Sequence, residues 1–396
     1  MSDFVFSFVT AIFTVGGLLG SLVANVVMDQ YGRRGASKVT ALLLAVGAGL
    51  MSISSSVTSL SFGRFLVGFG SGIGICVGPI YVAEIAPSKI SGNVGVLTQL
   101  GIVLGIMITQ IVGFRFATPT EWRLVLFLSS LTGILQFIAS YLVVETPTWL
   151  RIKGLSEESL TVSTRLWGVH FNETAPARAD DENPLLDESG SRRPDAQTGT
   201  TTVAQLFFTR ELHRPLMIVC FAMLSQQVSG TAYFFLYYSN EILSKSLPKW
   251  GPYVSLGITI VNVIMTFPPI IFIERVGRKQ LLTLSVLGAV ISLIAVGYGL
   301  NSGFTTLASI ATLTFVTSFA IGLGPIPFVM IPEAVSALSS MALSLNWIAN
   351  FLVGLIFLPL RSFLSDEDPT RQGRVFYVFV VVLLASSFTL FKVYRG

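Results

Sequence analysis

The chain has 396 residues, of which 52% are hydrophobic and 12% are charged, with a mean hydropathy of +0.74 and a formal net charge of +4. Soluble domains carry roughly twice that share of charged residues, because polar groups have to cover their surface. The composition therefore excludes a soluble globular protein and indicates an integral membrane protein whose partner is the lipid bilayer. The small net charge, spread over the loops, also argues against nucleic acid as a partner.

Eleven apolar runs are long enough to cross about 30 Å of hydrocarbon as helices. They cover residues 4–28, 39–58, 62–83, 93–114, 123–144, 215–243, 253–273, 281–300, 305–331, 339–361 and 375–394. The runs do not alternate between apolar and polar residues, as the strands of a membrane barrel would. We therefore expect an all-α polytopic membrane protein with about 11 transmembrane helices in two pseudo-symmetric bundles of five and six.

One long polar segment, residues 145–213, separates an N-terminal helix bundle (residues 1–144) from a C-terminal six-helix bundle (residues 214–396). Its middle is rich in Asp, Glu, Ser, Thr and Pro, which is typical of a disordered linker. Short amphipathic helices are expected at its two ends, near 156–168 and 203–211. A modest excess of Lys and Arg places this linker in the cytosol, on the same side as the loop after the first run.

A short charged stretch occurs twice. "DQYGRR" at 29–34 and "ERVGRK" at 274–279 each follow an apolar run, and an acidic residue follows two runs later, Glu84 in the first half and Glu333 in the second. An order that recurs in both halves is typical of a duplicated bundle. Two runs precede the stretch in the second half and only one in the first, so the first half is expected to lack its first helix.

Carboxylates and arginines at neighbouring helix ends can pair when the bundles close on the cytosolic side. We therefore expect a latch there. Its expected members are Asp29, Arg33, Arg34, Glu84, Glu145, Glu274, Arg278, Lys279 and Glu333. The alternative is that the basic loops only set the topology, which accounts for the arginines but not for the matched acids.

Glycine and proline mark two further runs. Glycines four residues apart, Gly70, Gly74 and Gly78 in one run and Gly16 and Gly20 in another, favour close helix packing. The stretch "GPIP" at 324–327 puts two prolines into a third run, where they remove N–H donors and predict a broken, gate-like helix.

The chain resembles the sugar-porter (glucose transporter-like) family of the major facilitator superfamily. The resemblance rests on "DQYGRR", "GRFLVGFGSGI", "YVAEIAPSKISG", "QLGIVLGIMITQ", "LSQQVSG", "ERVGRK", "GLGPIPFVMIPE" and "NWIANFLVG", which occur in this order. It implies helices around a central solute site, worked by rocking of two halves, and a glucose-like or polyol substrate. Family sugar contacts match Gln99, Gln226, Gln227 and Asn346.

The residues themselves point to the same place. Uncharged amides inside apolar runs are costly in lipid and usually face the protein interior; here they are Gln99, Gln226, Gln227, Asn262, Asn346 and Asn350. An amide both donates and accepts, as a sugar hydroxyl does. The aromatic residues that could pack on a sugar ring are Phe328, Trp347, Phe235, Tyr237 and Tyr238. The alternative role for the amides is hydrogen bonding between helices.

Several departures from the family pattern leave the solute open. No Asn follows the paired glutamines in "GTAYFFLYY" (230–238), Ala320 replaces an acid, and the chain stops at "FKVYRG" without the family's terminal motif. No carboxylate lies near the middle of a run, which favours a facilitator over a proton symporter.

The central linker contains "DDENPLLDE", in which Asp181, Leu185 and Leu186 resemble an acidic dileucine sorting signal. A sorting adaptor would then be a partner, and the membrane would be vacuolar or lysosomal. The alternatives are a chance leucine pair and the plasma membrane.

The sequence thus predicts transmembrane transport of a small neutral polyhydroxy solute, a hexose or polyol, by alternating access, with a facilitative mechanism. The alternative is a non-transporting nutrient sensor on the same fold. An enzyme is not expected, because neither His170 nor His213 lies in a run and no nucleophile–base pair is evident. No cofactor or metal is expected either, since Cys76 and Cys220 are isolated in apolar runs.

Overall fold

The computed structural model describes residues 3–87, 91–168, 213–229, 251–331, 336–365, 368 and 371–394. Within these residues the regular structure is helical and contains no strand, which confirms the expected all-α class. The first half contains α1 (Asp3–Ser52), α2 (Val57–Ile85), α3 (Ser91–Phe116) and α4 (Trp122–Ala139). Two short helices follow, α5 (Pro147–Ile152) and α6 (Ser156–Trp167). The second half contains α8 (His213–Val228), α11 (Gly251–Val276), α12 (Arg278–Asn301), α13 (Thr305–Ile321), α14 (Pro325–Met330), α15 (Ser336–Ser365) and α16 (Arg374–Val393).

The 50-residue α1 is two helices joined at Gly32, whose backbone angles (φ 76°, ψ 176°) are not helical. Glycine adopts this conformation because it has no Cβ. The two runs expected at 4–28 and 39–58 are the two arms of α1. The turn between them is therefore tighter than the hydropathy pattern suggested.

Nine helices in the described part of the chain are long and apolar enough to cross a membrane. Counting α1 as its two arms and adding the 16-residue α8 brings the number to the expected eleven. The expected run at 215–243 is only partly described, because residues 230–250 lie outside the described ranges. The amphipathic helix expected near 156–168 is α6, and the one expected near 203–211 lies outside the described residues.

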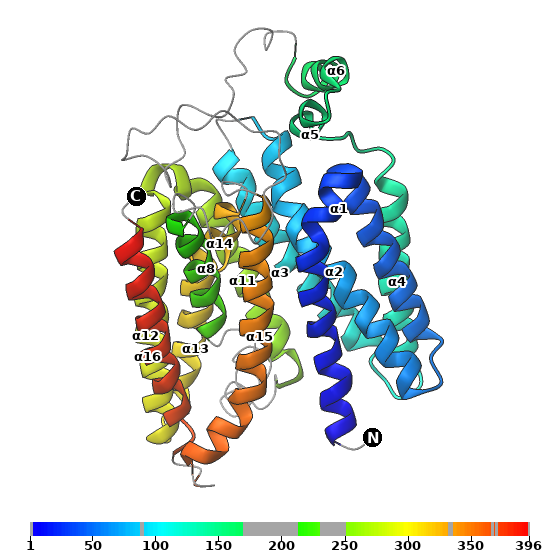
Figure 1. Cartoon of the computed structure of the whole chain (residues 1–396). Helices are drawn as coiled ribbons and strands as arrows, with labels where there is room; N and C mark the ends of the chain where they lie inside the picture. The colour runs from blue at the N-terminus through cyan, green and yellow to red at the C-terminus, as the bar shows by residue number, and fades with distance from the viewer. Residues whose placement is uncertain are drawn as a thin grey trace.

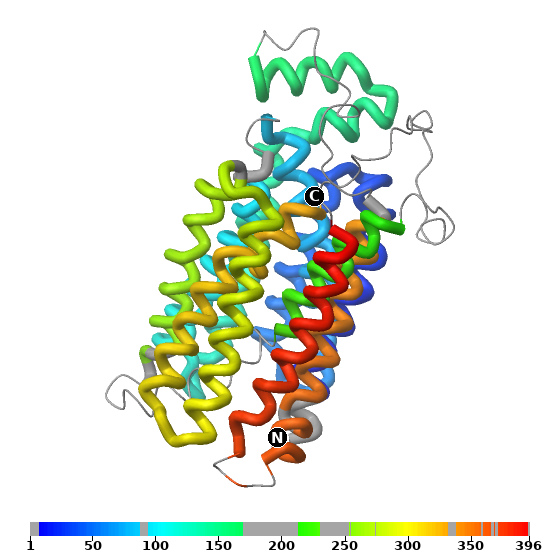
Figure 2. The backbone as a smooth tube through the Cα atoms, turned by 90° about the vertical axis from the view of Figure 1, so that its left-hand side faces the viewer, coloured from blue at the N-terminus to red at the C-terminus, as the bar shows by residue number. Residues whose placement is uncertain are grey.

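The long helices stand side by side in two groups (Figure 1). Helices of the second half lie on the left of this view and helices of the first half on the right, with α3, α11 and α15 between them. Contacts between the halves join α3 to α11, the first arm of α1 to α15, and α14 to α3. Helices α5 and α6 lie across one end of the bundle, seen from the side in Figure 2. We call this the α5–α6 end and the opposite end, where the N-terminus lies, the far end.

Close packing of α1 on α2 depends on the glycines that the sequence pointed to. A Cβ built on Gly16 or Gly20 would run into the backbone of Phe65 or Phe69, and the same holds for Gly72 against Gly17. The expectation is wrong for Gly78, because a Cβ there would meet nothing within 4 Å. Open space, not a neighbouring helix, faces Gly78.

Candidate solute-binding site and latch

The break between α13 and α14 creates the first polar feature of the interior. Pro327 has no N–H to donate to the Leu323 carbonyl, so that oxygen loses its helical partner. The Gln226 side chain of α8 replaces it: Nε2 donates to the carbonyl oxygens of Leu323 (3.1 Å) and Gly324 (2.9 Å). The broken helix expected from "GPIP" is therefore present, and a glutamine of a neighbouring helix satisfies its free carbonyls.

A chain of amides runs from Gln226 across to α15. Asn346 Nδ2 donates to Gln226 Oε1 (3.0 Å), and Gln227 Nε2 donates to Asn346 Oδ1 (3.2 Å). Asn350 Nδ2 then donates to Gln227 Oε1 (3.0 Å). Asn346 and Asn350 are four residues apart and so share one face of α15, opposite the paired glutamines of α8. We call these four residues the amide ladder.

The first half contributes Gln99, which lies on α3 and is 6% exposed. A Cβ built on Gly324 would lie 3.2 Å from Gln99 Nε2. Gln99 of the first half therefore lies next to Gly324, where the second-half helix is broken and where Gln226 is bonded. Gln226 and Asn346 are equally buried, at 5% and 6% exposure. The structure thus brings the four amides singled out by the resemblance together in the interior, away from lipid.

The charged residues of the first half meet at the α5–α6 end. Arg33 donates from Nη2 (2.8 Å) and Nε (3.2 Å) to Glu84 Oε1, and both side chains are nearly buried. Arg34 donates from Nε and Nη2 to the carbonyl oxygens of Ser140 and Tyr141, each at 3.0 Å. The two arginines therefore tie the second arm of α1 to the ends of α2 and α4.

Glu145 binds the same turn through its carboxylate. Its oxygens accept from the backbone N–H groups of Arg33 (2.9 Å), Arg34 (3.1 Å) and Thr146 (3.0 Å). The Gly32 break exposes these N–H groups as the N-terminus of a new helix, where a carboxylate is favourable. A Cβ on Gly32 would run into this carboxylate.

Two tryptophans at this end were missed in the sequence. Trp149 Nε1 donates to the Asp29 carbonyl (3.2 Å) and Trp167 Nε1 to the Ile85 carbonyl (3.1 Å), so α5 and α6 bond to carbonyls near the ends of α1 and α2. The bonded group at Asp29 is its carbonyl, not its carboxylate. Backbone acceptors leave no trace in a sequence, so only the presence of Trp in a polar linker could have signalled these contacts.

Comparison with known proteins decides the family. The family description "Sugar (and other) transporter" matches residues 2–395. A "Probable metabolite transport protein" of Saccharomyces cerevisiae is 31% identical over 392 residues, covering 96% of this chain and 78% of that protein. The human facilitated glucose transporter member 3 of solute carrier family 2 is 33% identical over 402 residues, covering 97% of this chain and 77% of its own. This chain belongs to the sugar porter family of the major facilitator superfamily.

The fold agrees with that of a solved sugar porter. The structure of the proton:xylose symporter XylE of E. coli bound to 6-bromo-6-deoxy-D-glucose superposes with a TM-score of 0.79 at 20% identity, covering 100% of this chain and 88% of that one. The protein is therefore an integral, multi-pass membrane protein with the major facilitator fold. Its family is one of sugar transport.

Other expected site residues of this sugar porter make no described hydrogen bond to the ladder. Asn262 on α11 is buried, and its Oδ1 has no hydrogen-bond partner among the described residues. Phe328 is buried in α14. Trp347 packs edge-on against Phe13 of the first half at 5.7 Å, and its buried Nε1 lacks an acceptor in the part of the chain that the structure describes.

Some expected residues lie outside what the structure describes. They are Phe235, Tyr237, Tyr238, the side chain of Glu274, Glu333, and the sorting-signal residues Asp181, Leu185 and Leu186. Arg278 and Lys279 start α12, where Lys279 Nζ lies 6.0 Å from the centre of the Tyr394 ring. Every latch contact described above is within the first half.

Proposed function

We propose that this sugar porter carries a small neutral polyhydroxy solute, a hexose or polyol, and holds it with Gln99, Gln226, Gln227 and Asn346. The observation that carries this proposal is the convergence of amides from both halves on the broken helix α13–α14. Each amide offers both a donor and an acceptor, so a hydroxyl can enter any link of the ladder and replace one amide–amide bond by two amide–hydroxyl bonds. No net charge has to be desolvated.

The ladder also suggests how binding is linked to movement. Gln226 joins α8 to the carbonyls of Leu323 and Gly324, which lie where the helix is broken. A solute hydroxyl that takes the Gln226 amide would free these carbonyls and loosen α14 from α8. Since α14 also contacts α3 of the other half, this release would act on the boundary between the halves.

We further propose that the bundles at 1–144 and 214–396 rock about this site, with the linker at 145–213 on the cytosolic side. The α5–α6 end would then face the cytosol. The contacts of Arg33, Arg34 and Glu145 would keep the first half rigid as it moves, since they bond α1 to α2 and to the end of α4.

We propose a facilitative mechanism. The carboxylates Asp29 and Glu84 of α1 and α2, and Glu145 between α4 and α5, gather at the α5–α6 end, and the ladder itself is uncharged. The human relative is named as a facilitated transporter and XylE as a proton symporter. The names of the relatives therefore favour neither mechanism over the other. The sensor alternative gains no support, because the relatives compared here are named as transporters.

Flux through purified protein tests the proposal. The full chain is reconstituted into liposomes, and uptake is followed for a panel of radiolabelled hexoses, pentoses and polyols, with and without an imposed pH gradient. We expect saturable uptake of at least one member, abolished in Asn346→Leu and independent of the gradient. Saturable binding without uptake of any member would contradict transport, and gradient-driven accumulation would contradict the facilitative mechanism.

A further inference from the structure

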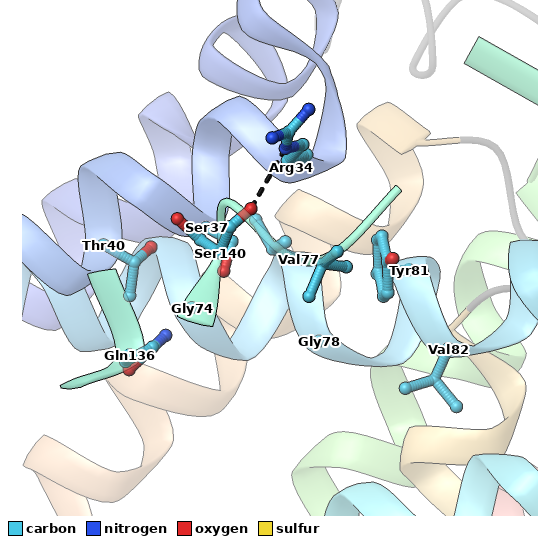
Figure 3. A pocket seen from close by; sticks show the side chains of 11 residues that line it. Arg34, Ser37, Thr40, Gly74, Val77, Gly78, Tyr81, Val82, Gln136 and Ser140 are labelled. Carbon is cyan, nitrogen blue, oxygen red and sulfur yellow. Dashed lines mark hydrogen bonds between the residues drawn. The ribbon is translucent and has the colours of Figure 1, made fainter. Parts of the chain in front are cut away.

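A cavity of about 210 Å³ lies in the first half near the α5–α6 end, apart from the amide ladder. It is formed by the second arm of α1, the C-terminal half of α2 and the end of α4 with the residues that follow it (Figure 3). Its polar lining includes Arg34, Ser37, Thr40 and Gln136, and its apolar lining includes Val77 and Val143. It is also the open space that faces Gly78.

Thr40 has an unsatisfied hydroxyl at this cavity. The residue is 3% exposed, and its Oγ1 has no hydrogen-bond partner among the described residues. Other buried threonines in the bundle, such as Thr266 and Thr312, donate to the carbonyl four residues earlier in their own helix. A buried hydroxyl without a partner is costly. The orphaned Thr40 hydroxyl therefore points to a polar group that enters the cavity from outside the chain.

The polar end of the cavity is cationic. The Arg34 guanidinium uses Nε and Nη2 for Ser140 and Tyr141, which leaves Nη1 as a further donor. Lys38, one turn further along α1, places Nζ 4.0 Å from the centre of the Tyr141 ring. The nearby carboxylate of Glu145 is held by backbone N–H groups. None of the lining residues carries a carboxylate.

The rest of the cavity suits hydrocarbon and opens toward lipid. Val77, Val82 and Val143 line it. Gln136 is exposed on α4, and Val143 is exposed just after the end of that helix. A group that enters here therefore comes from the bilayer side. Basic pockets between membrane helices at this depth bind anionic lipid headgroups.

We propose that this cavity binds an anionic phospholipid of the leaflet at the α5–α6 end. Its phosphate lies at Arg34 with an oxygen at the Thr40 hydroxyl, and the first part of an acyl chain lies along the valines. A zwitterionic lipid such as phosphatidylcholine would bring its choline cation, together with its phosphate, close to Arg34 and Lys38, which is less favourable. A free phosphate leaves the apolar part empty. The other class of occupant, a membrane helix of another polypeptide packed on α2 and α4 over the cavity, is distinguished by the test below.

Three variants of the full chain form the test. Gly78→Leu fills the cavity from α2 without a clash, because a Cβ at Gly78 meets nothing within 4 Å. Gly105→Leu is the matched control, since it adds the same side chain at an equally open glycine on the exposed face of α3. Thr40→Val removes only the orphaned hydroxyl and keeps the shape of the side chain.

The measurement is lipid binding by purified protein in neutral detergent, followed by native mass spectrometry and by the unfolding temperature. The additions are phosphatidylglycerol, phosphatidylcholine and glycerol phosphate at equal concentration. We expect phosphatidylglycerol alone to bind and to raise the unfolding temperature. Thr40→Val should weaken this binding about fivefold, the loss expected for one hydrogen bond. Gly78→Leu should abolish it, and Gly105→Leu should leave it unchanged.

The effect of Thr40→Val on the unfolding temperature can also be predicted in the absence of lipid. Removing an unsatisfied hydroxyl should leave the unfolding temperature unchanged or raise it. Equal binding of phosphatidylcholine, an effect of glycerol phosphate alone, or undiminished binding by Gly78→Leu would each overturn the proposal. Loss of a co-purifying membrane polypeptide in Gly78→Leu but not in Gly105→Leu would show that a helix is the occupant, and would overturn it as well.

Discussion

The two glycines of the repeated stretch adopt the same backbone conformation but have different surroundings. Gly32 joins the two arms of α1 at φ 76° and ψ 176°, and Gly277 separates α11 from α12 at φ 87° and ψ 150°. At Gly32 a Cβ would run into the Glu145 carboxylate, whereas at Gly277 it would meet nothing within 4 Å among the described residues. The repeat therefore preserves the turn itself, while the charged contacts around it are a property of each half.

The two halves also differ in how their last two helices are covered. In the second half α15 and α16 both pack against α8, and their most apolar stretches are 35% and 44% buried. The corresponding α3 and α4 of the first half are only 22% and 11% buried. No described helix of the first half takes the position that α8 takes in the second. Among the described residues, the last two helices of the first half are therefore less covered than their counterparts in the second half.

The largest effect is expected for the buried ion pair of the first half. Arg33→Gln leaves the Glu84 carboxylate without its partner at a nearly buried position, which costs about 3–5 kcal/mol of unfolding free energy. The measurement is denaturant unfolding of the protein in detergent micelles. Adding Glu84→Gln should recover a large part of the loss. Losses that simply add in the double variant would show that the two side chains do not interact.

The next largest loss of stability is expected when the glycine of either turn is replaced by alanine, and the two turns should differ. Gly32→Ala and Gly277→Ala both force a Cβ into a positive-φ conformation, at a cost of about 1–3 kcal/mol. Only Gly32→Ala also displaces Glu145 from the N–H groups of Arg33 and Arg34. We therefore expect the larger drop in unfolding temperature for Gly32→Ala. Equal drops would remove the difference between the halves on which this comparison rests.

Solute affinity is expected to respond to the amide ladder. Gln226→Leu removes the donor to the Leu323 and Gly324 carbonyls, so the apparent KM for uptake should rise about tenfold or more. Asn262→Leu is the matched control, a buried amide of the same half that makes no described bond to the ladder; it should change KM less than about twofold. A larger change in KM for Asn262→Leu than for Gln226→Leu would indicate that the solute binds at α11 instead of α8.

The smallest loss of stability is expected when a hydrogen bond between the two halves is removed. Ser21 of α1 and Ser344 of α15 are buried, with their hydroxyl oxygens 2.9 Å apart. Ser21→Ala removes one hydrogen bond and should cost about 0.5–1.5 kcal/mol. Ser225→Ala is the control within one half, since Ser225 donates to Ser386 at 3.0 Å. If transport is sensitive to contacts between the halves, Ser21→Ala should change its rate and Ser225→Ala should not.

The sequence predicted the spans, the repeat and the broken helix because each depends on local chemistry. Hydropathy indicates which segments lie in the membrane. Pro325 and Pro327 remove two N–H donors within three residues, which favours a break between α13 and α14. It also predicted buried amides, since lipid penalises them anywhere else. The resemblance then selected four of these amides, and the structure brings those four together.

Other features depend on tertiary contacts that a single sequence does not encode. The bonds from Trp149 and Trp167 end on backbone carbonyls, which every residue possesses. Asn262 has the same sequence signal as the ladder amides, yet it lies on α11 and its Oδ1 has no hydrogen-bond partner among the described residues. The cavity at Gly78 is a gap between three helices. Because the sequence shows only the spacing of the glycines, it predicted helix packing at Gly78 instead of open space.

The central claim is that two halves rock around a solute held between them, and a cross-link tests it most directly. At the α5–α6 end a Cβ on Gly95 would lie 3.5 Å from Val329 Cβ, a spacing that suits a disulfide between α3 and α14. In a background with Cys76→Ala and Cys220→Ala, the pair Gly95→Cys and Val329→Cys is oxidised and sugar uptake into liposomes is measured. We predict that oxidation abolishes uptake and that a reductant restores it, while the pair Ser21→Cys and Ser344→Cys, further from this end, retains more activity when oxidised. Full uptake with the Gly95–Val329 pair cross-linked would contradict the account.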